Sequence, residues 1–163
     1  QGDQAVAIGD SAGKTTQGTS AIALGETAGG TGQGDFSVAI GSGAGNTSQG
    51  TKAIAIGVTA ALASQGENAI AIGALSGGFA NPQAANSIIL NATGGAVENT
   101  TADSFVVKPV RNATMTTILG YDAGTGEVTH NAAIPGYINI ADLKVLVAAA
   151  STYSLFQTAI SNL

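Results

Sequence analysis

The amino-acid sequence predicts an all-β solenoid built from 16-residue coils, and three observations lead to this fold class. The first is a strand-like pentapeptide ending in glycine that begins every 16 residues, at Ala5–Gly9, Ala21–Gly25, Ser37–Gly41, Ala53–Gly57 and Ala69–Gly73. The second is a Gln-Gly pair four residues before each copy, at Gln1, Gln17, Gln33, Gln49 and Gln65. The third is a column of small residues after each pentapeptide, such as Ala12-Gly13 and Ala28-Gly29. A fixed internal period of this kind indicates stacked repeats.

Each coil is expected to contain a short strand, a glycine corner, a second short extended stretch and a Gln-Gly turn. Within Ala53–Ile56 alanine and isoleucine alternate, so the bulky side chains share one face of the strand and the alanines the other. Coils that stack at the ~4.8 Å spacing of neighbouring strands would make a rod ~24 Å long from five copies. The interior of so narrow a coil is thin, and the alanine face is flat and apolar. We therefore expect that the alanine face packs against another copy of the chain.

The composition excludes several classes of protein. The chain has no cysteine, which excludes disulfide scaffolds, zinc-thiolate sites and a cysteine nucleophile. The longest strongly apolar run, Val145–Ala150, is far shorter than the ~20 residues that span a bilayer, so no membrane insertion is expected. The net charge is −5, and the five basic residues are scattered along the chain, which argues against nucleic acid as a partner. Because the chain begins with Gln1, a processed product or a fragment is expected.

After Gly78 the 16-residue register breaks, and Asn81-Pro82 predicts a turn. A strand is expected at 87–91, two residues later than the period requires, and another at 104–108. The segments 117–121 and 127–130 flank a glycine-bearing loop and predict a β-hairpin.

The C-terminal segment has the pattern of a helix. Asn139 can cap its start, and apolar residues then alternate spacings of three and four, at Leu146, Ala149, Tyr153, Phe156, Ile160 and Leu163. A short coiled-coil trimerisation helix is predicted, with a helix folded back on the β-block as the alternative. The predicted organisation is thus head repeats over 1–80, a β-rich collar with a hairpin over 81–136, and a C-terminal helix over 137–163.

No catalytic, cofactor-binding or metal site is predicted, and the chain is not expected to be an enzyme. Gly9–Thr15 resembles a phosphate-binding loop, but three residues separate its glycines where the motif needs four. Gly29–Asp35 resembles a calcium-binding repeat but occurs only once, so a structural ion stays an open alternative. The single histidine, His130, lies at the end of a hairpin strand, where a surface or cross-strand role is favoured.

Two polar columns follow the repeat. Asp3, Thr19, Asp35, Thr51 and Glu67 alternate, which places the acids two coils apart, ~9–10 Å, on a solvated rim. In the second column, Gln17, Gln33, Gln49 and Gln65, stacked glutamines favour a side-chain amide ladder over a ligand site. Glycosylation sequons occur at Asn46, Asn91, Asn99 and Asn112.

The pentapeptides resemble the head repeats of trimeric autotransporter adhesins of the YadA type, over about residues 1–80. The resemblance implies a left-handed parallel β-roll in which three chains pack side by side as a homotrimer. A second block is similar to segments of viral and phage tail-fibre proteins over residues 86–134, through Ser87–Gly94, Phe105–Asn112 and Leu119–Asp122.

The predicted function is that of a structural and adhesive trimeric fibre segment, part of a viral or phage fibre, with the head of a bacterial cell-surface adhesin as the alternative. A polysaccharide-degrading solenoid and an ice-binding protein are less favoured. The expected partners are other copies of the chain and a host glycan or protein receptor, and the expected location is extracellular, on a virion or a bacterial surface. Receptor contact is expected in loops 91–104 and 111–126, with Arg111, Tyr121 and Asp122, unless these loops only cap the roll.

Overall fold

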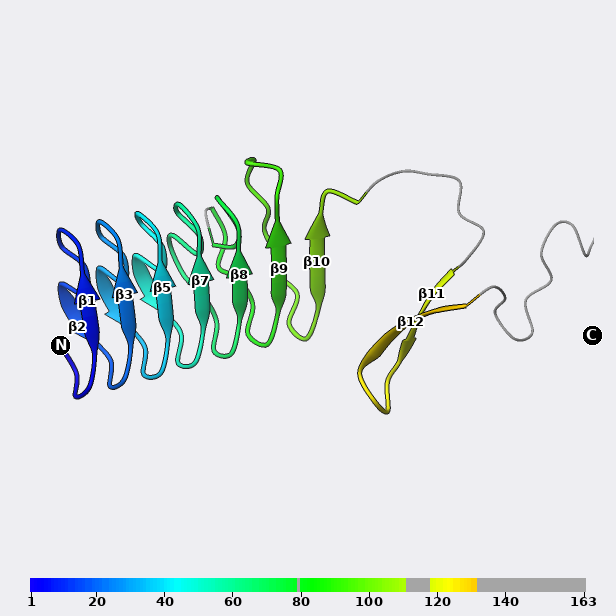
Figure 1. The fold of residues 1–163 in the computed structure, drawn as a ribbon, viewed down its shortest axis with the longest axis horizontal. Coiled ribbons are helices and arrows are strands. Elements are labelled where there is room, and N and C mark those ends of the chain that lie inside the picture. The colour runs from blue at the N-terminus through cyan, green and yellow to red at the C-terminus, as the bar shows by residue number, and fades with distance from the viewer. Residues whose placement is uncertain (79, 111–117, 132–163) are drawn as a thin grey trace, which may run out of the picture. The chain divides into compact units, whose positions relative to one another are not determined.

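The computed structural model describes residues 1–78, 80–110 and 118–131, and over residues 1–110 the chain is a parallel β-solenoid (Figure 1). One strand from each coil joins a seven-stranded sheet, the long sheet. Its strands are β1 (Val6–Ile8), β3 (Ile22–Leu24), β5 (Val38–Ile40), β7 (Ile54–Ile56), β8 (Ile70–Ile72), β9 (Ile88–Asn91) and β10 (Phe105–Lys108). A three-stranded parallel sheet, the short sheet, is formed by β2 (Thr15–Gln17), β4 (Thr31–Gln33) and β6 (Thr47–Gln49). The predicted solenoid is confirmed.

The register of the long sheet follows the sequence period. Val6 pairs with Ile22 and Ile54 pairs with Ile70, both 16 residues apart. Ile70 then pairs with Ile88 after 18 residues, and Ile88 with Phe105 after 17. The predicted two-residue delay is therefore confirmed. The long sheet also continues beyond residue 80, where the head repeats were expected to end, because the longer coils still deliver an apolar strand in register.

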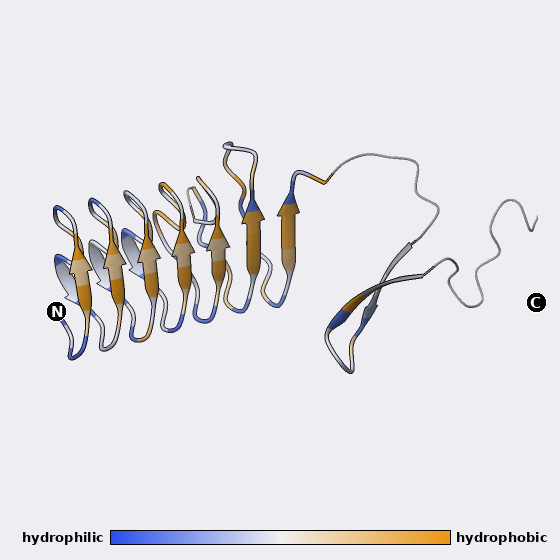
Figure 2. Ribbon diagram, in the orientation of Figure 1, coloured by the Kyte–Doolittle hydropathy of each residue, from blue (hydrophilic) through white to orange (hydrophobic). Residues whose placement is uncertain are grey.

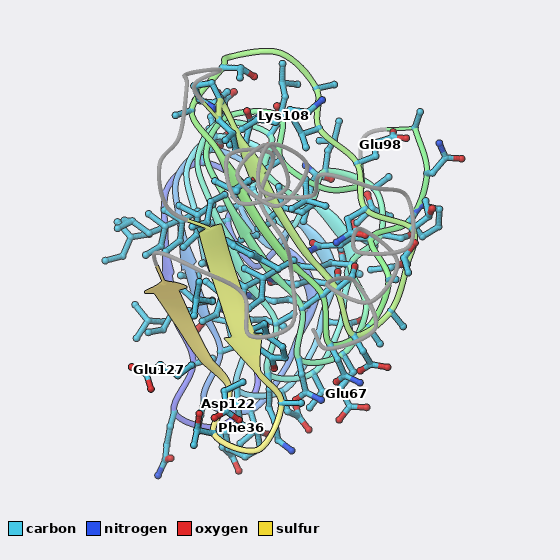
Figure 3. The ribbon with its side chains drawn as sticks, turned by 90° about the vertical axis from the view of Figure 1, so that its right-hand side faces the viewer. Phe36, Glu67, Glu98, Lys108, Asp122 and Glu127 are labelled. Carbon is cyan, nitrogen blue, oxygen red and sulfur yellow. The ribbon has the colours of Figure 1, made fainter. Side chains whose placement is uncertain are left out.

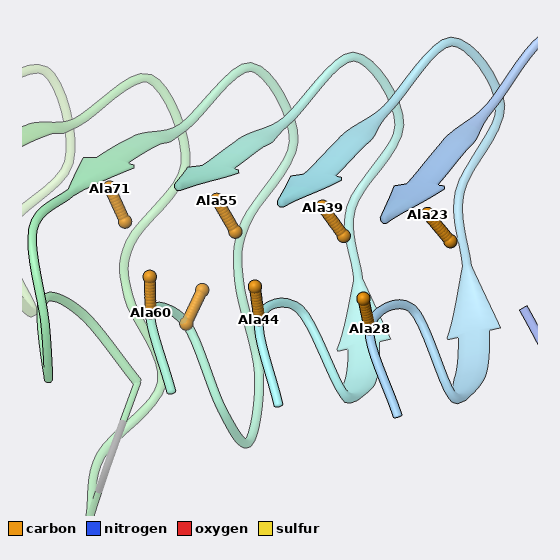
Figure 4. Close-up of a cluster of buried hydrophobic side chains, with 8 residues drawn as sticks. Ala23, Ala28, Ala39, Ala44, Ala55, Ala60 and Ala71 are labelled. Carbon is orange, nitrogen blue, oxygen red and sulfur yellow. The ribbon is translucent and has the colours of Figure 1, made fainter. Parts of the chain in front are cut away.

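The interior of the coils is built from alanine. Ala23, Ala39, Ala55 and Ala71 point inward from the long sheet and meet Ala28, Ala44 and Ala60 from the opposite side, and all seven are 0% exposed (Figure 4). The predicted alanine-to-alanine contact between copies is therefore wrong, since the alanines pack within one chain. Tight corners hold the two sides of each coil so close that methyl groups fill the space between them. The larger aliphatic side chains must then point outward.

The longer coils at the C-terminal end have a wider interior. In β9 the inward position is taken by Ile89, which is 0% exposed, where the preceding strands have alanine. Val97 is 4% exposed, and its backbone forms an isolated parallel β-bridge with that of Ser76. These two larger side chains fill the space that the extra residues create.

The pentapeptide glycines make the corner after each long-sheet strand. Gly25, Gly41 and Gly57 have φ values of 121–128°. A Cβ atom on Gly41 would lie 2.5 Å from the carbonyl oxygen of Gly57 in the next coil. Both the backbone conformation and the close approach of successive coils therefore require glycine at this position.

The predicted hairpin is confirmed as β11 (Ile118–Asp122) paired antiparallel with β12 (Glu127–Asn131). The Asp122 carboxylate organises its loop by accepting hydrogen bonds from the backbone N–H groups of Gly124 (2.7 Å) and Thr125 (3.1 Å). These contacts lower the pKa of Asp122, with the Gly124 N–H as the larger cause. The hairpin belongs to a second compact unit, residues 112–163. The predicted C-terminal helix lies outside the described residues.

Candidate functional site

The outward side chains of the long sheet form one apolar surface, which we call the aliphatic face. Each of the seven strands contributes two side chains, and none of them is polar: Val6, Ile8, Ile22, Leu24, Val38, Ile40, Ile54, Ile56, Ile70, Ile72, Ile88, Leu90, Phe105 and Val107. All are half-buried or exposed, and Ile8 and Phe105 reach 60% and 57% exposure. Figure 2 shows the same strands as a continuous hydrophobic band.

Strand geometry explains why this face is uninterrupted. The two-residue period puts alanine inward and the branched residues outward in every copy. The parallel register then places equivalent residues of neighbouring strands side by side, such as Ile40 and Ile56. β-Branched side chains also favour the extended backbone. With seven strands at ~4.8 Å the face extends over ~29 Å. Folded monomers rarely expose so large a contiguous apolar surface, which makes the aliphatic face the candidate interaction surface.

The Gln column lies inside the coil, and the predicted amide ladder forms from Gln49 onward, whereas Gln17 and Gln33 donate to backbone carbonyl oxygens. Gln49 donates from Nε2 to Oε1 of Gln65 at 3.1 Å, and Gln65 donates likewise to Gln83 at 3.1 Å. Gln49 also donates to the carbonyl oxygen of Val38 at 2.8 Å, which ties the short sheet to the long sheet across the interior. All five glutamines from Gln17 to Gln83 are at most 4% exposed, so the column is a structural element. Gln83 was missed from the sequence because the longer coil shifts its position by two residues.

The small residues that follow each pentapeptide are explained by packing against these glutamines. A Cβ atom on Gly13 or Gly29 would lie 2.5–2.6 Å from Oε1 of Gln17 or Gln33, respectively. In the fourth coil Ala61 occupies the equivalent position, and there Oε1 of Gln65 accepts a hydrogen bond from Gln49. The glycines of this column therefore make room for the buried amides.

The segment that resembles a phosphate-binding loop is a solenoid corner. The N–H of Gly13 donates to the carbonyl oxygen of Ala28, and that of Thr15 to Gly30, both at 2.9 Å. Both N–H groups donate to carbonyl oxygens of the next coil, so they are not available to bind a phosphate. In the segment that resembles a calcium-binding repeat, the carboxylate of Asp35 accepts the N–H of Thr19 at 2.8 Å. The described residues include no group of three or more possible metal ligands.

The sequon asparagines that the structure describes are buried or hydrogen-bonded within the solenoid. Asn91 is 6% exposed, and its Nδ2 donates to the carbonyl oxygens of Ala74 (2.7 Å) and Gly95 (2.8 Å). Asn99 is 5% exposed, and the Nδ2 of Asn46 donates to the carbonyl oxygen of Thr27 at 3.1 Å. In the folded chain the nitrogens of Asn91 and Asn99 are thus out of reach of a glycosylating enzyme. Asn112 lies outside the described residues.

The loops expected to contact a receptor fall into separate parts of the structure. Residues 92–96 are exposed, and the side chain of Asn91 holds Thr93 there through hydrogen bonds to its N–H (3.0 Å) and hydroxyl (2.7 Å). Tyr121, 71% exposed, belongs to the hairpin unit, as does Asp122. Arg111 lies outside the described residues. In the hairpin, the backbone of His130 pairs with that of Leu119, the cross-strand position expected for it.

A carboxylate binds the loop that lengthens the coil between Ile70 and Ile88. Glu98 accepts hydrogen bonds from Nδ2 of Asn81 (2.6 Å) and from the backbone N–H groups of Ala80 (2.7 Å) and Asn81 (3.0 Å). These contacts, with the Asn81 side chain as the largest, lower the pKa of Glu98 below its ordinary value of 4.5.

We predict that this loop opens in acid. A lowered folded-state pKa means that the contacts stabilise the loop above pH 4.5, and that this stabilisation is lost as the pH falls through the lowered pKa. Cleavage near residues 80–82, by a protease active on both sides of pH 4.5, should therefore increase as the pH falls below that value. Glu98→Gln should show fast cleavage at every pH tested. Equal cleavage of both proteins at pH 6 would contradict the prediction.

With the geometry described, the comparisons with known proteins can be added. Residues 17–44 and 48–76 match the family model of the YadA head domain repeat. The two matched stretches cover β3, β4, β5, β7 and β8 and all of β6 except Thr47, so the match falls on the most regular part of the solenoid. Comparisons with curated proteins and with solved structures return no match. Over the described ranges, the chain has no helix that is long and apolar enough to cross a membrane.

Proposed function

We propose that this chain is a head segment of a trimeric adhesin displayed on a cell surface, and that its copies associate through the aliphatic face. The observation that carries the proposal is the row of outward aliphatic side chains that a single chain leaves exposed. Burying each of them would contribute up to ~1.5–3 kcal/mol. The YadA head repeats favour the cell-surface adhesin, which the sequence offered as the alternative, over a viral or phage fibre.

The geometry of the face suits side-by-side association. All long-sheet strands are parallel, so copies related by an axis along the rod present identical coils to one another at every level. The aliphatic face supports association of copies but does not specify how many associate. That three chains associate rests on the resemblance to trimeric heads. No catalytic role is part of this proposal.

Light scattering on the full chain tests the proposal. The expected mass is three times the chain mass of 15.7 kDa. The double variant Ile40→Lys/Ile56→Lys places charges on neighbouring strands of the aliphatic face and should be monomeric with an unchanged far-ultraviolet circular dichroism spectrum. Burying unpaired ammonium groups between chains would cost several kcal/mol.

Val58→Lys is the matched control. Val58 is 57% exposed but lies just after the corner glycine Gly57, outside the aliphatic face, so this variant should remain trimeric. A monomeric parent chain, or a double variant that still assembles, would rule out the aliphatic face as the association surface.

A further inference from the structure

The turn before each long-sheet strand places one residue per coil in the left-handed backbone region. We call this column the left-handed corner: Gln4, Ser20, Phe36, Lys52, Asn68, Asn86 and Asp103, with φ between 55° and 58°. The backbone conformation is thus a property of the corner in every coil. Asn and Asp adopt it most readily among residues other than glycine, which agrees with their use at the C-terminal end of the column.

Side chains of the left-handed corner are hydrogen-bonded from coil to coil at both ends of the column. The Ser20 hydroxyl donates to Oε1 of Gln4 at 3.2 Å. Nδ2 of Asn68 donates to Oδ1 of Asn86 at 3.1 Å, and Nδ2 of Asn86 to Asp103 at 3.0 Å. The third and fourth coils interrupt this ladder with Phe36 and Lys52.

Phe36 has no evident structural role in the chain. Its ring is 56% exposed, it cannot continue the polar ladder, and its backbone is in a conformation that bulky residues avoid. In the view along the solenoid, Phe36 and Glu67 lie at the same end of the coil, opposite Glu98 (Figure 3). A residue that departs from a local rule without a structural gain is a candidate for function.

The residues next to Phe36 in the stack and in sequence are polar, and backbone hydrogen bonds between coils fix their register. The N–H of Phe36 donates to the carbonyl oxygen of Thr19 at 2.9 Å, and that of Lys52 to Asp35 at 2.8 Å. Lys52 is therefore one coil, ~4.8 Å along the stack, from Phe36. Ser20 lies one coil to the other side, and Asp35 is the preceding residue. Phe36 thus has polar neighbours in the stack and in sequence: Lys52, Ser20, whose hydroxyl donates to Gln4, and Asp35, whose carboxylate accepts the N–H of Thr19.

We propose that Phe36 and Lys52 form a carbohydrate-binding corner whose ligand is a pyranose of a surface glycan. A pyranose has one face of C–H groups, which can stack on the ring, and a rim of hydroxyl groups, which suit Ser20, Asp35 and Lys52. One exposed ring is too small for a stable protein interface, which needs about 1,000 Å² or more. The neighbouring acids Asp3, Asp35 and Glu67 disfavour an anionic lipid surface.

This inference rests on the proposed adhesive function, because a single ring binds weakly and needs several copies to hold a surface. It places a binding site inside the repeats, whereas the sequence predicted receptor contact in loops 91–104 and 111–126. Phe36 and Val58 are exposed to a similar degree, 56% and 57%, but at different corners, which provides a matched pair of positions.

Saturation-transfer NMR on the full chain tests the proposal, with lactose, cellobiose and N,N′-diacetylchitobiose as probes. At least one of these sugars should receive saturation on its ring protons. Phe36→Asn should lose at least tenfold in affinity for that sugar, whereas Phe36→Tyr, which keeps the ring, should retain it. Asn suits this corner, as Asn68 and Asn86 show, so Phe36→Asn should fold as well as the parent chain.

Val58→Asn should bind the sugar as the parent chain does. Light scattering on the same samples separates this proposal from the proposed function. If Phe36→Asn loses assembly, the ring belongs to a contact between chains and the carbohydrate site is wrong. Binding to none of the three sugars, or equal binding by Phe36→Asn, also overturns it. A monomeric parent chain that still binds a sugar through Phe36 would overturn the trimeric head and leave the carbohydrate site standing.

Discussion

A chain carrying Ala55→Glu should fail to form the solenoid. Ala55 is 0% exposed and belongs to the alanine interior that Ala44 and Ala60 complete from the opposite side. A carboxylate there would have neither space nor a partner, and a buried unpaired charge costs several kcal/mol, a large share of the ~5–15 kcal/mol that stabilises a typical domain. Far-ultraviolet circular dichroism should show loss of the β signal at room temperature.

Ile56→Glu is the control for this experiment, because the same new side chain then points outward from the neighbouring residue. This variant should retain the β signal and lose assembly. If Ala55→Glu folds normally and Ile56→Glu does not, the two faces of the strand have been assigned the wrong way round.

The second large effect is expected from Gly41→Ala. Gly41 has a φ of 121°, and an added Cβ would lie 2.5 Å from the carbonyl oxygen of Gly57, a backbone atom that cannot move without disturbing the next coil. Strain and overpacking together should cost more than ~3 kcal/mol. The denaturant concentration at the midpoint of unfolding should fall accordingly.

Gly32→Ala is the matched glycine substitution. Gly32 has a φ of 69°, its added Cβ would meet nothing closer than 3.7 Å, and the equivalent positions in the neighbouring coils are occupied by Thr16 and Ser48. Its cost should stay within ~1–2 kcal/mol. An equal loss of stability in the two variants would show that the close approach of Gly41 to Gly57 adds nothing to the cost of a positive φ.

The coil length, the strands and the hairpin followed from the sequence because each depends on local spacing. Alternation in Ala53–Ile56 defines two faces, but it does not say which one is inside. That choice depends on the distance between the two sides of the coil, which the corners determine. The column of Ala28, Ala44 and Ala60 contained the missing information, because an interior lined by alanine on one side leaves room only for alanine on the other.

The candidate carbohydrate site was partly visible in the sequence. Phe36 is one of only four phenylalanines in the chain, but its left-handed backbone and its hydrogen bond to the preceding coil appear only in the folded chain. The amide ladder was predicted from the Gln column, but Gln83 was missed because the longer coil places it 18 residues after Gln65 instead of 16.

The regularity of the aliphatic face has a consequence for how copies align. Because the face repeats at every coil, sliding one copy along another by one coil, ~4.8 Å, still places aliphatic side chains against aliphatic side chains. Such a slipped pair loses contact only at its two ends, so the five regular coils define the alignment poorly. The parts that do not repeat, Phe105 in β10 and the lengthened coils that contain Ile89 and Val97, mark one end of the stack as unique. In the proposed assembly, we therefore expect the irregular end of this solenoid, rather than its regular repeats, to determine the alignment of copies.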